Sequence, residues 1–490
     1  MDVHGCCAKA RMSLQQRAAR GVKWSTISQV GRQIMQLATT LVLARLLSPA
    51  DFGLASMAMV VIGFVLIFKD LGTSAAIIQR RELSPELLSS VFWMNILLGI
   101  VATLLLFLTA PLLAAFYREP RVTPLLQVLS LSFFLSSLGA LQQALLERDL
   151  AFDRLAKVEV GAVVVGTLGG IGTALMGGGA WSLIVQSLMM AGVTSLMLWI
   201  FARWRPQAYC TWSEIRPIVR YSLNLVGFNT FNYFARNADY LLIGRFLGAT
   251  SLGYYTLAYR IMLYPTQNIA AVIGRVIFPV FAQLQDDHQH FRQGYLQVTS
   301  VIAMITFPLM LGLLLVSEPL VAAFFGPQWA SVATLLMIFA PVGLTQSIGT
   351  TVGAIYQAKG RTDLLLYWGI GSGLLVVAAF AVGLHWGVLG VATAYAIASL
   401  ILLYPSFAIP LRLIDLPLRD LGRVLWRSLA SGLLMAAGLF ALRSALPASS
   451  SPLLVLSALV PVGVLIYVLA SWILNGDQIR QTLALVGVRR

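Results

Sequence analysis

Apolar runs of about twenty residues recur along the whole chain and are separated by short polar stretches. A helix of about 20 apolar residues crosses the hydrocarbon core of a bilayer, whereas an outer-membrane barrel would show short alternating strands. The pattern therefore predicts an all-α polytopic membrane protein with about 14 transmembrane helices. The predicted spans are 22–47, 53–79, 87–116, 122–146, 155–176, 180–202, 217–245, 252–282, 293–316, 330–358, 363–384, 387–410, 423–445 and 452–475.

Two of these apolar segments carry matching polar stripes, with each residue of the second at its counterpart's number plus 200. The stripes are Gln29, Arg32, Gln36 and Thr39 in the first span, and Asn229, Asn232, Arg236 and Asp239 in the seventh. Steps of three and four residues place each stripe on one helical face. The loops that follow also match without a gap, LARLLSPADFG (43–53) against IGRFLGATSLG (243–253). This repeat predicts two pseudo-symmetric six-helix lobes of the same orientation.

The repeat also sets the expected domain organisation. We expect a cytoplasmic N-terminal leader at 1–20, an N-lobe of helices 1–6 at 21–205, a C-lobe of helices 7–12 at 206–410, and helices 13–14 with a cytoplasmic tail at 411–490. The basic stretch 411–427 is expected to lie along the inner interface. The first apolar segment is too long for a cleavable signal peptide and lacks a small-x-small cleavage site.

Composition and charge support this topology. The chain is 58% hydrophobic and 11% charged, whereas a soluble domain carries about 25% charged residues. The net charge of +15 is spread between the apolar segments, which argues against nucleic-acid binding. With a cytoplasmic N-terminus, most Lys and Arg residues fall on the inner side, and the outer loops hold Arg45, Arg118, Arg121, Arg245 and Arg443. By the positive-inside rule, both termini are expected in the cytoplasm.

The sequence offers no catalytic or metal-binding constellation. It lacks a Walker motif and zinc-ligand spacing, and His288 and His290 lie in a polar loop, QDDHQH. The three cysteines all fall on the predicted cytoplasmic side, so no disulfide is expected. We therefore expect neither an enzyme nor a bound metal or cofactor.

Charged side chains inside the predicted spans are the main functional signal, since a charge in hydrocarbon costs several kcal/mol unless it faces water or a partner. Spans 1, 2, 7 and 8 contain the cations Arg32, Lys69, Arg236, Arg260 and Arg275, and the acids Asp70 and Asp239. A path with this surplus attracts anions, because guanidinium groups match phosphate and carboxylate geometry. A conduit for drug cations or Na⁺ would need the reverse balance.

Several of these charges also have a structural explanation. Lys69 and Arg275 could extend to the inner headgroups, and Arg236 could pair with Asp239 along one helix. Arg32 has no acidic neighbour in its own helix, which favours a cavity role. Prolines inside the spans, such as Pro308, fit either ordinary membrane-helix composition or bending during transport.

The motifs GVKWSTISQVGRQ…LARLLSPADFG and FKDLGTSAAIIQRRELS (68–84), together with the twofold layout, resemble a known family. It is the polysaccharide-transporter branch of the multidrug/oligosaccharidyl-lipid/polysaccharide exporter superfamily, the Wzx-type flippases. The resemblance covers about residues 12–475. It implies two lobes around a cavity lined largely by helices 1, 2, 7 and 8. It also implies movement of undecaprenyl-pyrophosphate-linked repeat units across the bacterial inner membrane, but it transfers no invariant residue.

We therefore expect a flippase that serves exopolysaccharide, capsule or O-antigen (lipopolysaccharide) synthesis by alternating access around a cationic cavity. The expected substrate-binding residues are Arg32, Gln36, Lys69, Asn232, Arg236, Asp239, Tyr259, Arg260 and Arg275. Asp70 or Asp239 could couple H⁺ or Na⁺, although nothing in the sequence requires it. Expected partners are the lipid-linked oligosaccharide and membrane lipids, and possible ones are the polymerase and glycosyltransferases of the same pathway.

Three other functions stay open. A peptidoglycan lipid II flippase also needs a cationic cavity, so the charge balance cannot separate it from a polysaccharide flippase. A small-molecule cation antiporter of the same superfamily would need acidic cavity residues. A membrane-embedded polymerase or glycosyltransferase would show large outer loops and acidic catalytic groups, whereas the outer loops here are short.

Overall fold

The computed structural model divides into two compact units, Met1–Phe234 and Ala235–Arg490, which are described separately. It describes residues 14–69, 77, 83–202, 204–209, 211, 230, 232–234, 236–266, 288–447 and 449–485, without the side chains of 14–28, 30, 67–69, 288 and 477–485. Every regular element in these residues is a helix. Candidate residues Asn229, Asp70 and Arg275, and the side chain of Lys69, lie outside the described part.

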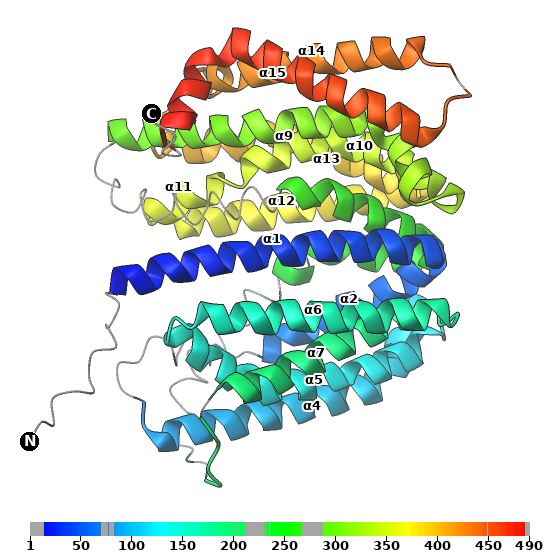
Figure 1. Cartoon of the computed structure of the whole chain (residues 1–490), viewed down its shortest axis with the longest axis vertical. Coiled ribbons are helices and arrows are strands. Elements are labelled where there is room, and N and C mark those ends of the chain that lie inside the picture. Colours follow the sequence, from blue (N-terminus) through cyan, green and yellow to red (C-terminus); the bar gives the residue numbers. More distant parts are fainter. Residues whose placement is uncertain are drawn as a thin grey trace, which may run out of the picture. The chain divides into compact units, whose positions relative to one another are not determined.

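The described part of the first unit contains six long helices (Figure 1). They are α1 (Leu14–Leu46), α2 (Pro49–Lys69), α4 (Pro85–Tyr117), α5 (Val122–Arg148), α6 (Phe152–Leu175) and α7 (Trp181–Phe201). Helix α6 packs against α1 and α7, and α5 packs against α4 and α7. The start of α4 follows standard capping chemistry: Ser84 accepts a hydrogen bond from the Leu87 amide at 3.1 Å, and Pro85 takes the first helical position.

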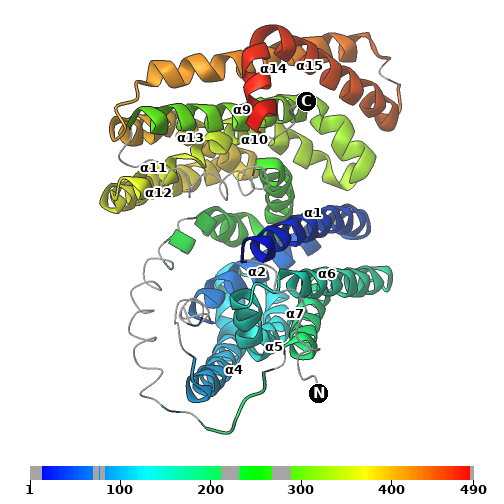
Figure 2. The same cartoon turned by 60° about the vertical axis from the view of Figure 1, so that its left-hand side comes forward.

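The second unit begins with the helical residues 236–266, within which Gly248 has a φ of 81°. The helices that follow are α9 (His288–Phe324), α10 (Ala330–Gly349), α11 (Val352–Ala358), α12 (Thr362–Gly383), α13 (Gly387–Arg412), α14 (Leu418–Ala445) and α15 (Pro452–Leu485). Helices α14 and α15 both lie along α9 in two views (Figures 1 and 2). Two single-turn 3₁₀ helices, Pro327–Trp329 and Leu384–Trp386, precede α10 and α13.

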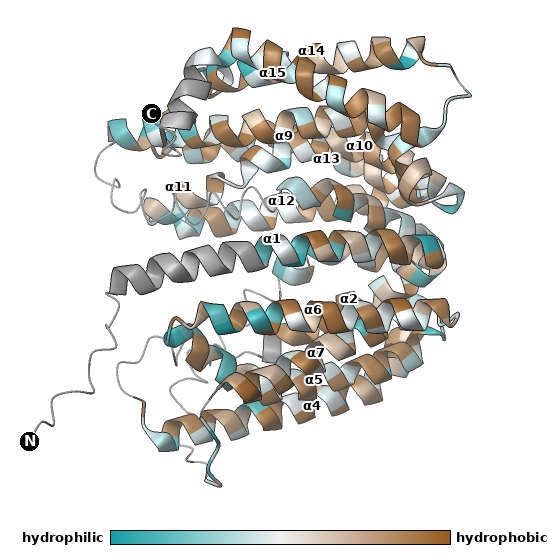
Figure 3. Cartoon of the chain, in the orientation of Figure 1, coloured by the Kyte–Doolittle hydropathy of each residue, from teal (hydrophilic) through white to brown (hydrophobic). Residues whose placement is uncertain are grey.

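The surface and the helix lengths identify a polytopic membrane protein. Within the described residues, ten helical stretches are long and apolar enough to cross a bilayer, and one of them, Thr362–Arg412, contains both α12 and α13. Apolar residues run along most of α4, α5 and α7 (Figure 3). Large side chains such as Leu108 and Ile473 are 72% and 77% exposed, which suits contact with lipid chains rather than water. The predicted fold class is confirmed.

Each of the predicted spans overlaps a helix, and several helix ends are as predicted, among them the starts of α5, α10 and α13, but others differ. Helix α1 begins at Leu14 instead of residue 22, because LQQRAAR contains strong helix formers and no glycine or proline. His290, predicted in a loop, lies in the first turn of α9. The predicted link 411–427 is mostly helix, since α13 ends at Arg412 and α14 starts at Leu418.

The border between the compact units, at Phe234/Ala235, falls inside the predicted seventh span. The lobe limits drawn from the repeat stay a prediction.

The two matched loops of the repeat differ in how the chain reverses direction at equivalent positions 48 and 248. In the first copy, Ser48 and Asp51 form a capping box around Pro49: the Asp51 amide donates to the Ser48 hydroxyl (3.3 Å), and the Ser48 amide donates to the Asp51 carboxylate (3.0 Å). In the second copy, Gly248 occupies the position of Ser48 and adopts a left-handed conformation that favours glycine. One copy therefore uses side-chain capping, and the other uses glycine.

Candidate functional site

Arg32 forms an ion pair inside the first unit. Its guanidinium lies 3.5 Å from the carboxylate of Glu159 on α6 and also donates to the side-chain carbonyl of Gln29, one turn earlier on α1. At about 1.5 Å per residue, Arg32 lies about 21 Å before the end of α1 at Leu46, within the thickness of a bilayer core. The Arg32 and Glu159 side chains remain 30% and 41% exposed. The pair is thus neutralised but accessible.

The rest of the first stripe divides between α6 and the surface. Thr39 is buried, and its hydroxyl lies 2.9 Å from that of Thr167 on α6. Gln36 is exposed. The stripe on α1 therefore serves partly as a packing surface for α6, with Gln36 and part of Arg32 left accessible.

In the second unit, Asp239 is 4% exposed and hydrogen-bonded within its own helical stretch. It accepts from the Tyr255 hydroxyl and from the Tyr240 amide, each at 2.9 Å. Among the described residues, no ion pair joins Asp239 to Arg236, so the side-chain pairing considered from the sequence is not formed. Asp239 is therefore a buried carboxyl group whose hydrogen-bond donors come from the neighbouring backbone and from Tyr255.

Burial agrees between the two stripes at two positions. Thr39 and its counterpart Asp239 are both buried, whereas Gln36 and its counterpart Arg236 are both exposed. Accessibility therefore agrees at these two positions of the repeat, whereas Arg32 is partly buried and its counterpart Asn232 is exposed.

Tyrosines lie beside Asp239 and continue, with one glutamine, onto α10 and α13. The rings of Tyr255 and Tyr259 stack with centroids 5.9 Å apart, and the Tyr259 hydroxyl lies 3.5 Å from that of Tyr395 on α13. Gln346 on α10 donates to both the Tyr259 hydroxyl (3.3 Å) and the Tyr395 hydroxyl. We call Asp239, Tyr255, Tyr259, Gln346 and Tyr395 the tyrosine cluster.

Sequence reasoning selected Asp239 and Tyr259 but missed Gln346 and Tyr395. The available signal was their polar character within long apolar runs. The other candidates, Asn232, Arg236 and Arg260, are exposed in the structure. Substrate binding by all of these residues stays a prediction. In the described residues, no group of three or more His, Cys, Asp or Glu side chains could hold a metal ion.

Long apolar helices that carry exposed or ion-paired arginines define a multi-spanning membrane protein with accessible charge in its spans. A profile of the family described as "Polysaccharide biosynthesis protein" matches residues 42–334, and the chain belongs to this family. The resemblance seen in the sequence is thereby confirmed.

The chain is similar to several relatives over most of its length. It is 32% identical to the lipopolysaccharide biosynthesis protein WzxC of Escherichia coli (strain K12), over 80% of both chains. It is 30% identical to the teichuronic acid biosynthesis protein TuaB of Bacillus subtilis (strain 168), over 79% of this chain and 81% of TuaB. It is 29% identical to the succinoglycan biosynthesis transport protein ExoT of Rhizobium meliloti (strain 1021), over 74% of both.

Solved structures share the fold at low identity. The lipid II flippase MurJ in an inward closed conformation matches with a TM-score of 0.76 and 17% identity, over 93% of this chain and 99% of MurJ. An inward-facing multidrug resistance MATE family transporter of the MOP superfamily matches with a TM-score of 0.64 and 17% identity, over 78% of this chain and 94% of the transporter. These matches establish the fold.

Proposed function

We propose that the protein is a flippase for polyprenyl-diphosphate-linked oligosaccharides, a transporter and not an enzyme. It lies in the bacterial inner membrane with both termini in the cytoplasm. The relatives are named for the biosynthesis of lipopolysaccharide and teichuronic acid and for succinoglycan transport, which supports a substrate of this class. The undecaprenyl form and the pathway enzymes as partners belong to the same proposal.

The observation that carries this proposal is a set of accessible guanidinium groups on apolar helices. Arg236 and Arg260 are exposed, and Arg32 is 30% exposed beside Glu159. A diphosphate headgroup offers several anionic oxygens, and guanidinium forks bind such oxygens with two parallel hydrogen bonds. The polyprenyl chain needs only an apolar surface and stays in lipid, so the protein has to carry the headgroup and sugars.

In this mechanism, Glu159 forms an ion pair with Arg32 when no substrate is bound. The carboxylate compensates a charge that would otherwise cost several kcal/mol inside the bilayer. The substrate diphosphate competes with Glu159 for the same guanidinium. Glu159 therefore lowers the affinity of the site for the substrate and assists substrate release. An interior-negative potential favours outward movement of the anion by about 2.3 kcal/mol per charge per 100 mV.

Coupling to H⁺ or Na⁺ through Asp239 or Asp70 is compatible with this scheme but not required by it.

The test compares single arginine variants in cells that depend on this protein for polymer export. Arg236→Gln and Arg260→Gln should each lower export at least about tenfold, since losing one charge-assisted contact costs about 1.5–3 kcal/mol. Lipid-linked repeat units should accumulate on the inner leaflet. The matched control is Arg419→Gln, an exposed arginine at the start of α14. Normal export in both variants, at wild-type protein level, would remove these residues from the proposal.

Lipid II flipping is the runner-up because the fold is shared with MurJ. A peptidoglycan flippase is needed for viability, so deletion of the gene should be lethal under that function. Under the proposed one, cells should grow and lack the polymer.

A further inference from the structure

Two prolines interrupt the hydrogen bonding of helix α9. Pro308 and Pro319 both lie inside the helix, and proline has no backbone N–H. In an α-helix, the N–H of each residue bonds the carbonyl four positions earlier. The carbonyls of Met304 and Leu315 therefore lack the donor that an unbroken helix would supply.

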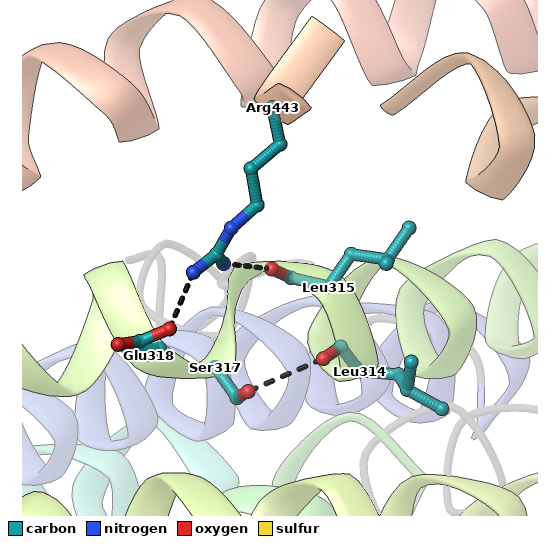
Figure 4. A network of polar contacts seen from close by, with 5 residues as sticks. All are labelled: Leu314, Leu315, Ser317, Glu318 and Arg443. Atoms are coloured by element: carbon teal, nitrogen blue, oxygen red, sulfur yellow. Dashed lines mark hydrogen bonds and ion pairs between the residues drawn. The ribbon is translucent and has the colours of Figure 1, made fainter. Parts of the chain in front are cut away.

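Both carbonyls receive a donor from the C-terminal helix pair. The hydroxyl of Tyr467 on α15 donates to the carbonyl of Met304 at 2.6 Å. The guanidinium of Arg443 on α14 donates to the carbonyl of Leu315 at 2.9 Å and also pairs with Glu318, one turn further on α9 (Figure 4). Each proline in α9 is thus matched by one side chain from the neighbouring pair.

Helical geometry explains how one neighbour can serve both sites. Pro308 and Pro319 are about three helical turns apart, so the carbonyls that they free lie on the same face, about 16 Å apart along the axis. Between these points α14 approaches α9 closely: a Cβ at Gly432 would lie 2.8 Å from the Leu311 side chain. Leu311, Leu315 and Tyr467 then pack with Met435, Leu439 and Leu459.

We propose that α14 and α15 act as a brace for α9, in which Tyr467 and Arg443 are positioning residues that replace the donors removed by Pro308 and Pro319. The carbonyl of Met304 lies well inside the predicted span 293–316, where no water is available and only a neighbouring protein group can compensate it. The carbonyl of Leu315 lies near the end of that span, where the partly exposed Arg443 supplies the donor. We therefore expect α9 to stay rigid at Pro308 and Pro319 and not to bend there. It follows, resting on the proposed function, that α9, α14 and α15 move together during transport.

Double-mutant cycles on the purified full-length protein test the brace directly. Tyr467→Phe should raise the thermal unfolding rate about tenfold, because it leaves the part-buried carbonyl of Met304 unpaired. In a Pro308→Ala background the backbone regains the missing N–H, so the same Tyr467→Phe change should have little effect. The second cycle pairs Arg443→Gln with Pro319→Ala and predicts the same loss of effect. Additive effects in both cycles would overturn the proposal.

Three controls separate the carbonyl contacts from other roles of these side chains. Glu318→Gln removes the charge that pairs with Arg443 but leaves the hydrogen bond from Arg443 to the Leu315 carbonyl. It should therefore change the unfolding rate less than Arg443→Gln. Tyr404→Phe alters a tyrosine on α13 that is 66% exposed and should have no effect. If Tyr467→Phe alone fails to accumulate as folded protein, adding Pro308→Ala should restore it, and failure to do so counts against the brace.

Polymer export is measured separately in the same variants. Tyr467→Phe should reduce export, and Pro308→Ala/Tyr467→Phe should restore it to the level of Pro308→Ala alone. Reduced export that Pro308→Ala does not restore would overturn the assignment of Tyr467 as a positioning residue. The unfolding cycles need no substrate, so they decide the brace even if the wild-type protein proves to carry a different cargo.

Discussion

The carboxylate of Asp51, at the start of α2, accepts a hydrogen bond from the backbone N–H of Ala180, just before α7, at 3.0 Å. The same carboxylate accepts from the amide and hydroxyl of Ser48, at 3.0 and 2.6 Å. One acidic side chain therefore caps α2 and ties together two loops that are far apart in the sequence. Gly179, which precedes Ala180 and lies against this carboxylate, has a φ of 52°.

Gly179→Ala should destabilise the first unit. A methyl group there would lie 2.7 Å from the Asp51 carboxylate, and the backbone conformation disfavours a side chain. We expect a loss of about 1–2 kcal/mol from the left-handed conformation alone. Thermal unfolding in detergent measures it, with Gly172→Ala, where nothing lies within 4 Å of the added methyl, as the matched control. Equal stability of the two variants would contradict this explanation.

Asp51→Ala should cost more than Asp51→Asn. The alanine leaves the Ser48 and Ala180 amides without their partner, whereas asparagine retains an acceptor oxygen. The expected loss for alanine is about 1–3 kcal/mol in unfolding free energy. Denaturant titration of both variants checks the order, and a larger loss for asparagine would refute the hydrogen-bonding role.

Exchanging the charges of the Arg32–Glu159 pair should restore stability but not transport. Arg32→Glu combined with Glu159→Arg preserves the ion pair, so the double variant should be more stable than either single one. Transport should stay impaired, because the cation has moved from α1 to α6. Protein level and polymer export, measured together, test both parts. Full recovery of export would mean that the pair is structural.

Glu159→Gln should strengthen headgroup binding if Glu159 competes with the substrate for Arg32. We expect tighter binding of a soluble diphosphate probe and slower turnover, since release is hindered. Isothermal titration on purified protein measures the affinity, with Glu86→Gln at the start of α4 as a control. Unchanged or weaker binding would rule out the competition.

Tyr255→Phe should be more damaging than Asp239→Asn. The phenylalanine leaves a buried carboxyl without its hydroxyl donor, at a cost of about 1–3 kcal/mol, whereas asparagine can still accept from Tyr255. If Asp239 also couples ions, Asp239→Asn should fold normally and lose the dependence of transport on the ion gradient. Unfolding and flux assays separate these outcomes, and a normally stable Tyr255→Phe would argue against the hydrogen bond as a structural element.

The helices were predictable because their signal is local, and the repeat was visible because two segments 200 residues apart match in sequence. Apolar runs mark spans, and the match of LARLLSPADFG with IGRFLGATSLG marks the repeat. The partner of Arg32 was not predictable in this way. Glu159 lies on another helix, near the start of the predicted span 155–176, and its pairing with Arg32 depends on how α1 and α6 pack.

The sequence by itself determined that the chain spans a membrane, where its helices run, and that cations exceed acids in spans 1, 2, 7 and 8. These properties follow from transfer free energy and helical periodicity, which act over a few turns. Only the tertiary structure decided which charges are neutralised and which polar groups are satisfied. It placed Glu159 beside Arg32, Tyr255 beside Asp239, and Tyr467 beside the carbonyl that Pro308 frees. Inside a bilayer a polar group must find a protein partner, and that partner is set by helix packing and not by sequence distance.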